Sequence, residues 1–239
     1  MKRPPVRFVR YELRTSDVAA ARAFYAAVLG AEFWRAPFAV TTLPERAAVA
    51  GAPPHWLGWL GTADVEATVN AVVAHGGQRL GTPPSPQSTA AETLLRDPFG
   101  AVLGVGAAAL TPGIDHAVAW HVHHGPEPAR ALTLYTALFG WVGDPAADAV
   151  AGANAVPQLR FRWAPGGALA GGFAALAGGK QRVHPQWLHL FRVPDLEAAA
   201  AQVAAAGGRM LGRMPTPGGA IVSAGEDPQG AAFALWQDA

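Results

Sequence analysis

The first group of residues that could do chemistry lies near the N-terminus, in the stretch RYELR. Here Arg10, Glu12 and Arg14 alternate with apolar residues, so a strand would place all three on one face. Two guanidinium groups on such a face could hold a carboxylate or a phosphate, and Glu12 could serve as a general base. The alternatives are an ion pair between Arg10 and Glu12, or a face that is open to solvent.

The second group is a set of histidines in the stretch WHVHHG and further along the chain. His121 and His123 lie two residues apart and share one strand face, and His189 lies in a later strand-like stretch. Imidazole is a common ligand of divalent metals, so these three are the candidate metal ligands of the chain. The alternative is a hydrogen-bonded interior role, because His121 takes the place that Tyr11 has in a repeated phrase.

Other kinds of chemistry find little support in the sequence. The 239 residues include no cysteine, and no serine nucleophile motif, P-loop or dinucleotide-binding fingerprint is present. A formal net charge of +1, without basic or acidic runs, gives no electrostatic case for nucleic acid or an anionic membrane surface. The longest apolar stretches are too short to span a bilayer, so we expect a soluble cytoplasmic protein without nucleic-acid or membrane partners.

The strands and helices that must position these residues occur in an internal sequence repeat. The phrase RYELRTSDVAAARAFYAAVLG at Arg10–Gly30 aligns without a gap to WHVHHGPEPARALTLYTALFG at Trp120–Gly140, at an offset of 110 residues. The stretches that start at His55 and Gln186 also match, as do DPFGAVLGV and DPQGAAFAL. The chain therefore contains an internal repeat over most of its length.

The repeat divides the chain into two halves, and each half divides again. We expect a first domain at residues 1–110 and a second at 114–239, separated by a linker signal at Thr111–Gly113. In each half, alternating strand patterns lead into an acidic N-cap residue, an apolar helical stripe and a closing glycine. The DPxG sequences predict type I turns before closing strands. The pattern predicts an α+β fold with largely antiparallel sheets and helices over one face.

These motifs resemble those of the vicinal oxygen chelate superfamily, which contains glyoxalases, extradiol dioxygenases and bleomycin-resistance binding proteins. The resemblance rests on SDVAAARAFYAAVLG, PEPARALTLYTALFGW, PHWLGWLGTADVEAT, HPQWLHLFRVPDLEAA and the two DPxG turns, and it covers nearly the whole chain. It implies four βαβββ units that pair into two glyoxalase-like domains, each with a cupped sheet that holds the ligand. More narrowly, the chain resembles tandem two-domain glyoxalase-like proteins.

The first unit is shorter than this scheme requires. Between Gly30 and His55 lie 24 residues, whereas 45 lie between Gly140 and Gln186. Since a strand takes about five to six residues plus turns, we expect the first unit to lack one or two strands. The first cup is then incomplete, or the other domain or a partner chain closes it. A homodimer is one way in which a partner chain could do so.

The resemblance also implies where a metal would bind. Metal-dependent members carry His, Glu or Gln on the first strand of each unit and on the last strand. The corresponding residues here are Arg10, Leu57 and Gly104 in the first half and Trp120, Leu188 and Ala234 in the second. None of these side chains offers a lone pair suited to a divalent cation. We therefore expect no metal and no other cofactor, unless a register slip of one residue brings His121, His123 or His189 into the site.

Because every second residue of a strand lies on the same face, the predicted ligand positions identify further residues on the ligand-binding face of each cup. In the first half this face holds the charged residues Arg10, Glu12 and Arg14 together with Leu57, Trp59, Val102 and Gly104. In the second half it holds Val118, Trp120, Val122, Leu188, Leu190, Ala232, Ala234 and Trp236. The first cup therefore offers charges beside Trp59, and the second is aromatic and apolar, with Trp120, Leu188 and Trp236 as candidate ligand-binding residues.

The favoured function is a metal-independent small-molecule-binding protein of the glyoxalase and bleomycin-resistance type, with an aromatic or hydrophobic ligand. The alternative is a lyase or dioxygenase-like enzyme that acts on a small metabolite, with Glu12 as its candidate catalytic residue. A third interpretation is a scaffold whose cups are filled by side chains. Fold resemblance alone does not decide among the three.

Overall fold

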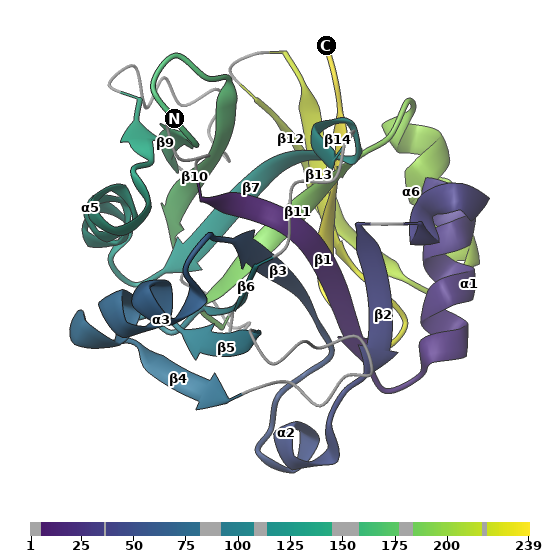
Figure 1. The fold of residues 1–239 in the computed structure, drawn as a ribbon. Helices are drawn as coiled ribbons and strands as arrows, with labels where there is room; N and C mark the ends of the chain where they lie inside the picture. The colour runs from purple at the N-terminus through teal and green to yellow at the C-terminus, as the bar shows by residue number, and fades with distance from the viewer. Residues whose placement is uncertain are drawn as a thin grey trace.

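The structure is a computed structural model that describes residues 6–35, 37–81, 92–107, 114–144, 158–176, 184–216 and 219–239. The predicted linker at Thr111–Gly113 lies outside these residues. The described residues form two sheets with flanking helices, one sheet from each half of the sequence (Figure 1). The predicted α+β class with mostly antiparallel strand pairs is confirmed.

The first half forms a six-stranded sheet in the order β2-β1-β3-β6-β5-β4. Its strands are β1 (Arg7–Thr15), β2 (Phe38–Thr42), β3 (His55–Gly61), β4 (Gln78–Gly81), β5 (Thr93–Arg96) and β6 (Val102–Gly106). Its helices are α1 (Val18–Leu29), the 3-10 helix η1 (Ala31–Trp34), α2 (Glu45–Val49) and α3 (Val65–Ala74).

The second half forms an eight-stranded sheet in the order β12-β13-β14-β11-β7-β10-β9-β8. Its strands are β7 (Val118–Gly125), β8 (Val142–Gly143), β9 (Gln158–Arg162), β10 (Leu169–Ala175), β11 (Gln186–Arg192), β12 (Arg209–Pro215), β13 (Ile221–Glu226) and β14 (Ala232–Gln237). Its helices are α4 (Ile114–Ala117), α5 (Pro128–Phe139) and α6 (Leu196–Ala205).

The first unit is two strands short of the third. β2 runs parallel to β1, just as β10 runs parallel to β7, so Ala39 beside Glu12 takes the place of Gly172 beside Val122. Beyond β10 the second sheet continues with β9 and β8, whereas the described part of the first sheet ends at β2. Among the described residues, the first sheet therefore contains no counterparts of β8 and β9.

The helices begin and end where the sequence indicates. Asp17, Asp64 and Asp195 each accept a hydrogen bond from a backbone N–H of the first helical turn, at the starts of α1, α3 and α6. α5 instead has Pro128 in its first turn, where a missing N–H costs nothing. Gly140 ends α5 in the left-handed conformation, with a φ of 73°.

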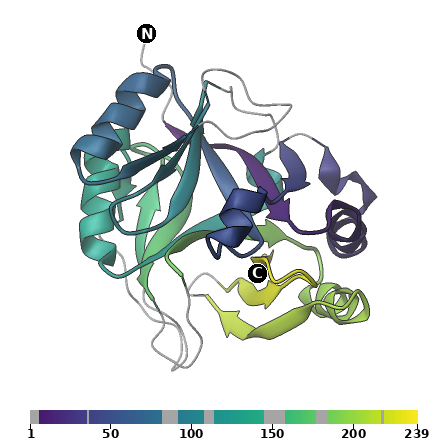
Figure 2. The ribbon, with the colours of Figure 1, turned by 90° about the horizontal axis from the view of Figure 1, so that it is seen from below.

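The two sheets lie one in front of the other, and the helices cover the two sides of the space between them (Figure 1). Helix α3 of the first half lies beside α5 of the second, and α1 lies beside α6 (Figure 2). The main hydrophobic core draws on both halves, because one continuous cluster includes residues of β1, β3, β7, β11 and these four helices. The faces of the sheets that point toward this core are called the inner faces below, and the opposite faces are the outer faces.

Each half also inserts a tyrosine into a turn of the other half. The Tyr25 hydroxyl of α1 donates to Asp227 in the DPQG turn (3.3 Å), and the Tyr135 hydroxyl of α5 donates to Asp97 in the DPFG turn (3.0 Å). Burial, with a contribution from these carboxylates, raises the pKa of both tyrosines well above the ordinary value, so both hydroxyls stay protonated donors. Equivalent residues therefore join the two halves reciprocally.

A bulge near the start of β1 and of β7 changes which side chains face the core. The pairing of β1 with β3 shifts between Phe8 and Arg10, and the pairing of β7 with β11 shifts at the equivalent place. As a result Phe8 and Val118 both belong to the main core. The prediction that Val118 lies on the ligand-binding face is wrong, because strict alternation fails at the bulge.

Among the described residues, no helix is long and apolar enough to cross a membrane.

Candidate functional site

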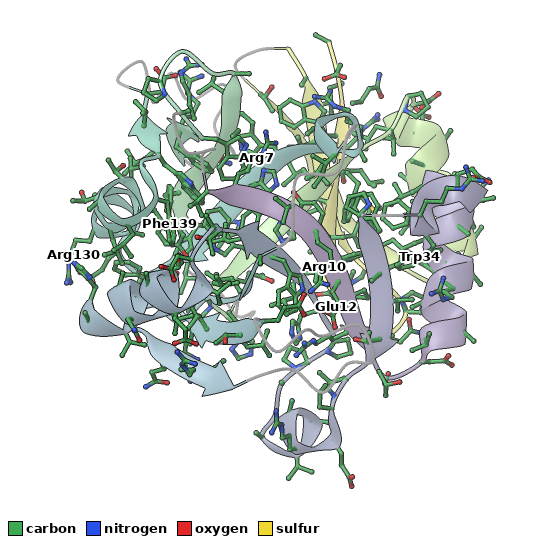
Figure 3. All side chains as sticks on the ribbon, viewed as in Figure 1. Arg7, Arg10, Glu12, Trp34, Arg130 and Phe139 are labelled. Carbon is green, nitrogen blue, oxygen red and sulfur yellow. The ribbon has the colours of Figure 1, made fainter. Side chains whose placement is uncertain are left out.

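The outer face of the first sheet carries the charged residues that the sequence singled out. Arg10 and Glu12 extend from β1 (Figure 3), and Arg14 follows them on the same strand. Beneath them Leu57, Trp59 and Leu94 form a small buried cluster that is separate from the main core. We call this set of residues the first outer face.

Glu12 lies at the centre of a hydrogen-bond network on this face. Its carboxylate accepts from the Thr41 hydroxyl (2.7 Å), from Nε of Arg14 (3.2 Å) and from the indole N–H of Trp59 (3.1 Å). Its side chain is 5% exposed, so these three donors replace water around a buried charge. Such an arrangement gives Glu12 a structural role and engages its carboxylate oxygens with donors of the protein itself.

Arg10 makes a different pair from the one the sequence suggested. Its guanidinium group lies over the Trp59 ring, 4.1 Å from the ring centroid, and contacts Glu92 at 3.1 Å. Arg10 with Glu92 and Arg14 with Glu12 therefore neutralise each other on the first outer face. No excess positive charge remains among these four residues to attract a carboxylate or a phosphate.

Trp59 fills the middle of the first outer face. It is 1% exposed and lies flat against Gly104 of β6, where a side-chain carbon would come within 2.3 Å of the indole ring. Only glycine leaves room for the ring at that position. The floor of this face is therefore occupied by the protein's own aromatic side chain.

The outer face of the second sheet is apolar. Its floor consists of the buried side chains Val122, Ala174, Leu190 and Ala234. Around this floor stand partly buried residues: Trp120, Leu188, Val222, Ala224 and Trp236. We call these nine residues, together with the β9 residues described next, the second outer face.

Two tryptophans dominate this face. The rings of Trp120 and Trp236 stack, with centroids 5.7 Å apart and planes inclined by 17°. They come from β7 and β14, on either side of the floor strand β11. Partly exposed aromatic rings above small aliphatic side chains are typical of sites for flat apolar ligands.

The second outer face also has a polar side, whose residues were not among the site residues predicted from the sequence. In β9, Gln158, Arg160 and Arg162 alternate with Leu159 and Phe161, and the latter two pack against the main core. The alternation in QLRFR is the signal that could have revealed this strand. Gln158 accepts a hydrogen bond from the Trp120 indole N–H at 2.9 Å, which places its side chain on the same face as the tryptophan.

A metal of the kind that the vicinal oxygen chelate families use does not fit these faces. The observed register aligns Arg10, Trp59 and Gly104 across the first sheet, and Trp120, Leu190 and Ala234 across the second. The sequence predicted that Leu57 and Leu188 lie in these two rows of aligned residues. Instead Leu57 pairs with Glu12, and Leu188 pairs with Val122. Neither row offers a lone pair for a divalent cation. Among the residues that the structure describes, no three His, Asp or Glu side chains lie close enough together to hold a metal ion.

The candidate histidine ligands lie on the inner face of the second sheet. Nδ1 of His121 contacts the Ala170 carbonyl at 2.9 Å, and Nε2 contacts the Tyr11 hydroxyl at 2.5 Å. Because a carbonyl oxygen can only accept, Nδ1 carries the proton of neutral His121 and Tyr11 donates to Nε2. His121 is therefore engaged on both nitrogens by groups of the core.

The other two histidines are also buried in the core. His123 contacts Asp97 through Nε2 at 2.7 Å, in the same turn that Tyr135 reaches. His189 is 1% exposed, and burial, with a smaller effect of His121, lowers its pKa well below the ordinary value. Neither ring nitrogen of His189 has a hydrogen-bond partner in the described part of the chain. These side chains are built into the interface between the sheets rather than into a surface site.

Two family models match the chain, one in each half. Residues 7–105 match the model described as "Glyoxalase/Bleomycin resistance protein/Dioxygenase superfamily", and residues 120–236 match the model described as "Glyoxalase-like domain". Together they span nearly the whole chain.

Individual proteins that are similar to this chain carry names of the same kind as these family models. The chain is 28% identical over 257 aligned positions to the protein named "Putative glyoxylase CFP32" of Mycobacterium tuberculosis and of Mycobacterium bovis, covering 95% of this chain and 93% of the relative. Among solved structures, homoprotocatechuate 2,3-dioxygenase from Brevibacterium fuscum is similar with a TM-score of 0.62 and 14% identity, covering 99% of this chain and 82% of that one. A Mn(II)-bound glyoxalase from Novosphingobium aromaticivorans gives a TM-score of 0.58 and 15% identity, covering 99% and 83%. At such identities the structural likeness concerns the fold.

Proposed function

Since the chain belongs to the glyoxalase, bleomycin resistance protein and dioxygenase superfamily, we propose that it binds a small aromatic or hydrophobic molecule on the second outer face, without a metal. The observation that carries this proposal is the stacked pair Trp120 and Trp236 above a floor of small aliphatic side chains. An aromatic ligand would extend this stack and remove the partly exposed rings from water.

Metal independence is supported by the donor set. Arg10, Trp59 and Gly104 in one row and Trp120, Leu190 and Ala234 in the other cannot supply ligands, whichever divalent ion is considered. The ligand would therefore be held by packing and a few hydrogen bonds.

The second outer face is a better candidate than the first. The first is filled by Trp59, and its four charged side chains form two ion pairs with each other. A ligand there would have to displace Trp59 or break an ion pair with low exposure, which costs free energy before any contact is gained.

An enzyme of lyase or dioxygenase type is the alternative, and the name of the mycobacterial relatives favours it. Such an enzyme would need a group to move protons at the reacting atom. Glu12 is the candidate from the sequence, yet it accepts three hydrogen bonds and is buried. This arrangement argues against a catalytic role for Glu12 on the first outer face.

A fluorescence titration of chelator-treated protein with naphthalene, a flat apolar probe, tests the proposal. We expect saturable binding that weakens about tenfold or more in Trp120→Ala and in Trp236→Ala, because each substitution removes one ring of the stack. Trp34→Ala is the matched control, since Trp34 lies on the α1 side of the molecule and packs against the main core, not on the second outer face (Figure 3). Equal binding by all variants would overturn the proposal, and so would binding that requires an added divalent ion.

A further inference from the structure

The hydrogen bond between Trp120 and Gln158 fixes the orientation of the glutamine amide. An indole N–H can only donate, so the atom of Gln158 that faces it, 2.9 Å away, must be the carbonyl oxygen Oε1. The amide nitrogen Nε2 therefore points away from this bond and keeps both of its N–H groups. No described residue accepts a hydrogen bond from it.

The backbone beneath Gln158 is shaped to receive this side chain. Gln158 pairs with Ala174 of β10, and its side chain lies over Gly172. A side-chain carbon at position 172 would come within 2.5 Å of Oε1, so only glycine permits the observed placement. In the first half the equivalent strand position is Ala39, and the described residues contain no counterpart of β9.

The neighbouring groups on the outer side of β9 are also mainly donors. Arg160 and Arg162 continue the alternation from Gln158, and both contact the carboxylate of Asp144, at 3.4 and 3.7 Å. Two guanidinium groups therefore contact one carboxylate at this edge of the second outer face. The floor residues and the two tryptophans carry no side-chain acceptor of their own, and the Trp236 indole N–H donates to the Asp238 carboxylate at 2.8 Å.

We propose that Gln158 determines specificity on the second outer face, by selecting ligands whose aromatic body carries a carbonyl or carboxylate oxygen. The proposal rests on the function proposed above and adds the polar group that the ligand must have. An oxygen placed against Nε2 replaces the water that the amide loses when the ligand binds. A pure hydrocarbon of the same shape leaves the N–H groups without a partner, and its binding is penalised.

The test compares two probes of similar shape, para-fluoroacetophenone and para-fluoroethylbenzene, by fluorine NMR titration of the chelator-treated protein. The ketone oxygen is the only acceptor that distinguishes them. We expect the wild-type protein to bind the ketone about threefold to tenfold more tightly, which corresponds to one neutral hydrogen bond. In Gln158→Leu the two dissociation constants should become equal, mainly because ketone binding weakens.

Two further variants keep the test decisive. Gln158→Glu preserves the shape and the bond from Trp120 but replaces Nε2 by an acceptor, so it should disfavour the ketone even if Gln158→Leu does not fold. Gln202→Leu, an exposed glutamine on α6, is the matched control and should keep the wild-type preference.

The outcomes separate this inference from the proposed function. If both probes bind the wild-type protein equally, or if the ketone preference survives in both Gln158 variants, the role of Gln158 is refuted while the binding face stands. If neither probe binds at all, the proposed function fails and this inference fails with it.

Discussion

Tyr11 and His121 occupy the same position in the two repeats, and they form a hydrogen bond with each other. The Tyr11 hydroxyl and Nε2 of His121 are 2.5 Å apart, and 110 residues separate them in sequence, which is the offset of the repeat. A pseudo-twofold relation between the halves brings equivalent positions together at its centre. A hydrogen bond between these two positions needs a donor on one side and an acceptor on the other, so the two repeats carry different residues there.

A double-mutant cycle measures this contact. Tyr11→Phe and His121→Leu should each destabilise the protein, and their effects should add to more than the effect of the double variant. We expect a coupling free energy of about 1 kcal/mol, measured by urea denaturation. Strict additivity of the two substitutions would show that the bond does not stabilise the interface.

The reciprocal tyrosine contacts predict unequal effects in the two turns. Asp97 accepts from both Tyr135 and His123, whereas among the described residues of the other half only Tyr25 donates to Asp227. Asp97→Ala should therefore destabilise the protein by about 1–3 kcal/mol more than Asp227→Ala, because it leaves a second buried donor unsatisfied. Chemical denaturation of the two variants side by side gives the comparison, and equal losses would refute it.

His189 predicts how stability depends on pH. Its folded-state pKa is lowered, so below about pH 6.5 the unfolded chain binds a proton that the folded protein does not. Stability should therefore fall as the pH drops below that value, toward the folded-state pKa. The titratable groups whose rings contact the ring of His189 are those of Tyr11 and His121.

His189→Leu tests this dependence. The substitution removes a buried ring whose nitrogens lack partners in the described residues, so it should stabilise the protein by about 1–3 kcal/mol at neutral pH. It should also reduce the slope of unfolding free energy between pH 6 and 5 by about 1.4 kcal/mol per pH unit, the value for one proton. Part of the slope should remain below pH 5, because burial lowers the pKa of His124 to about 4. An unchanged slope would contradict the assignment to His189.

Two glycines should respond differently to alanine. At Gly104 the added methyl group would collide with the buried Trp59 ring, which the network around Glu12 holds in place, so Gly104→Ala should destabilise the fold by about 1–3 kcal/mol. At Gly172 it would come within 2.5 Å of Oε1 and 2.7 Å of Cβ of the partly exposed Gln158, so Gly172→Ala should displace this side chain and abolish the ketone preference, with a smaller loss of stability than at the buried Gly104 site. Urea denaturation and the fluorine NMR titration distinguish the two, and a large preference for the ketone in Gly172→Ala would contradict the placement of Gln158.

The sequence alone predicts most of the architecture. Period-two alternation places Glu12 and Trp59 on one side of the first sheet and Tyr11 on the other. These features depend on neighbours along the chain, which local patterns report well. The bulges that turn Phe8 and Val118 inward escape such patterns, because one extra residue reverses the alternation without leaving a composition signal.

The polar side of the site depends on pairings that no local pattern contains. QLRFR alternates as a strand should, but its position beside β10 determines that Gln158 meets Trp120, 38 residues earlier. The same holds for Arg10, whose partner is Glu92 rather than the nearby Glu12. Side-chain partners across a sheet follow from register, and register in this fold is set by the repeat and its bulges.

The most direct test of the central claim is a two-dimensional NMR titration of the indole N–H signals, using chelator-treated protein and naphthalene. The eight tryptophans provide reporters in both halves of the molecule. We predict that the signals of Trp120 and Trp236 shift in a saturable way while that of Trp59 stays in place. A shift of Trp59 alone, or shifts that appear only after a divalent metal ion is added, would contradict metal-independent binding on the second outer face.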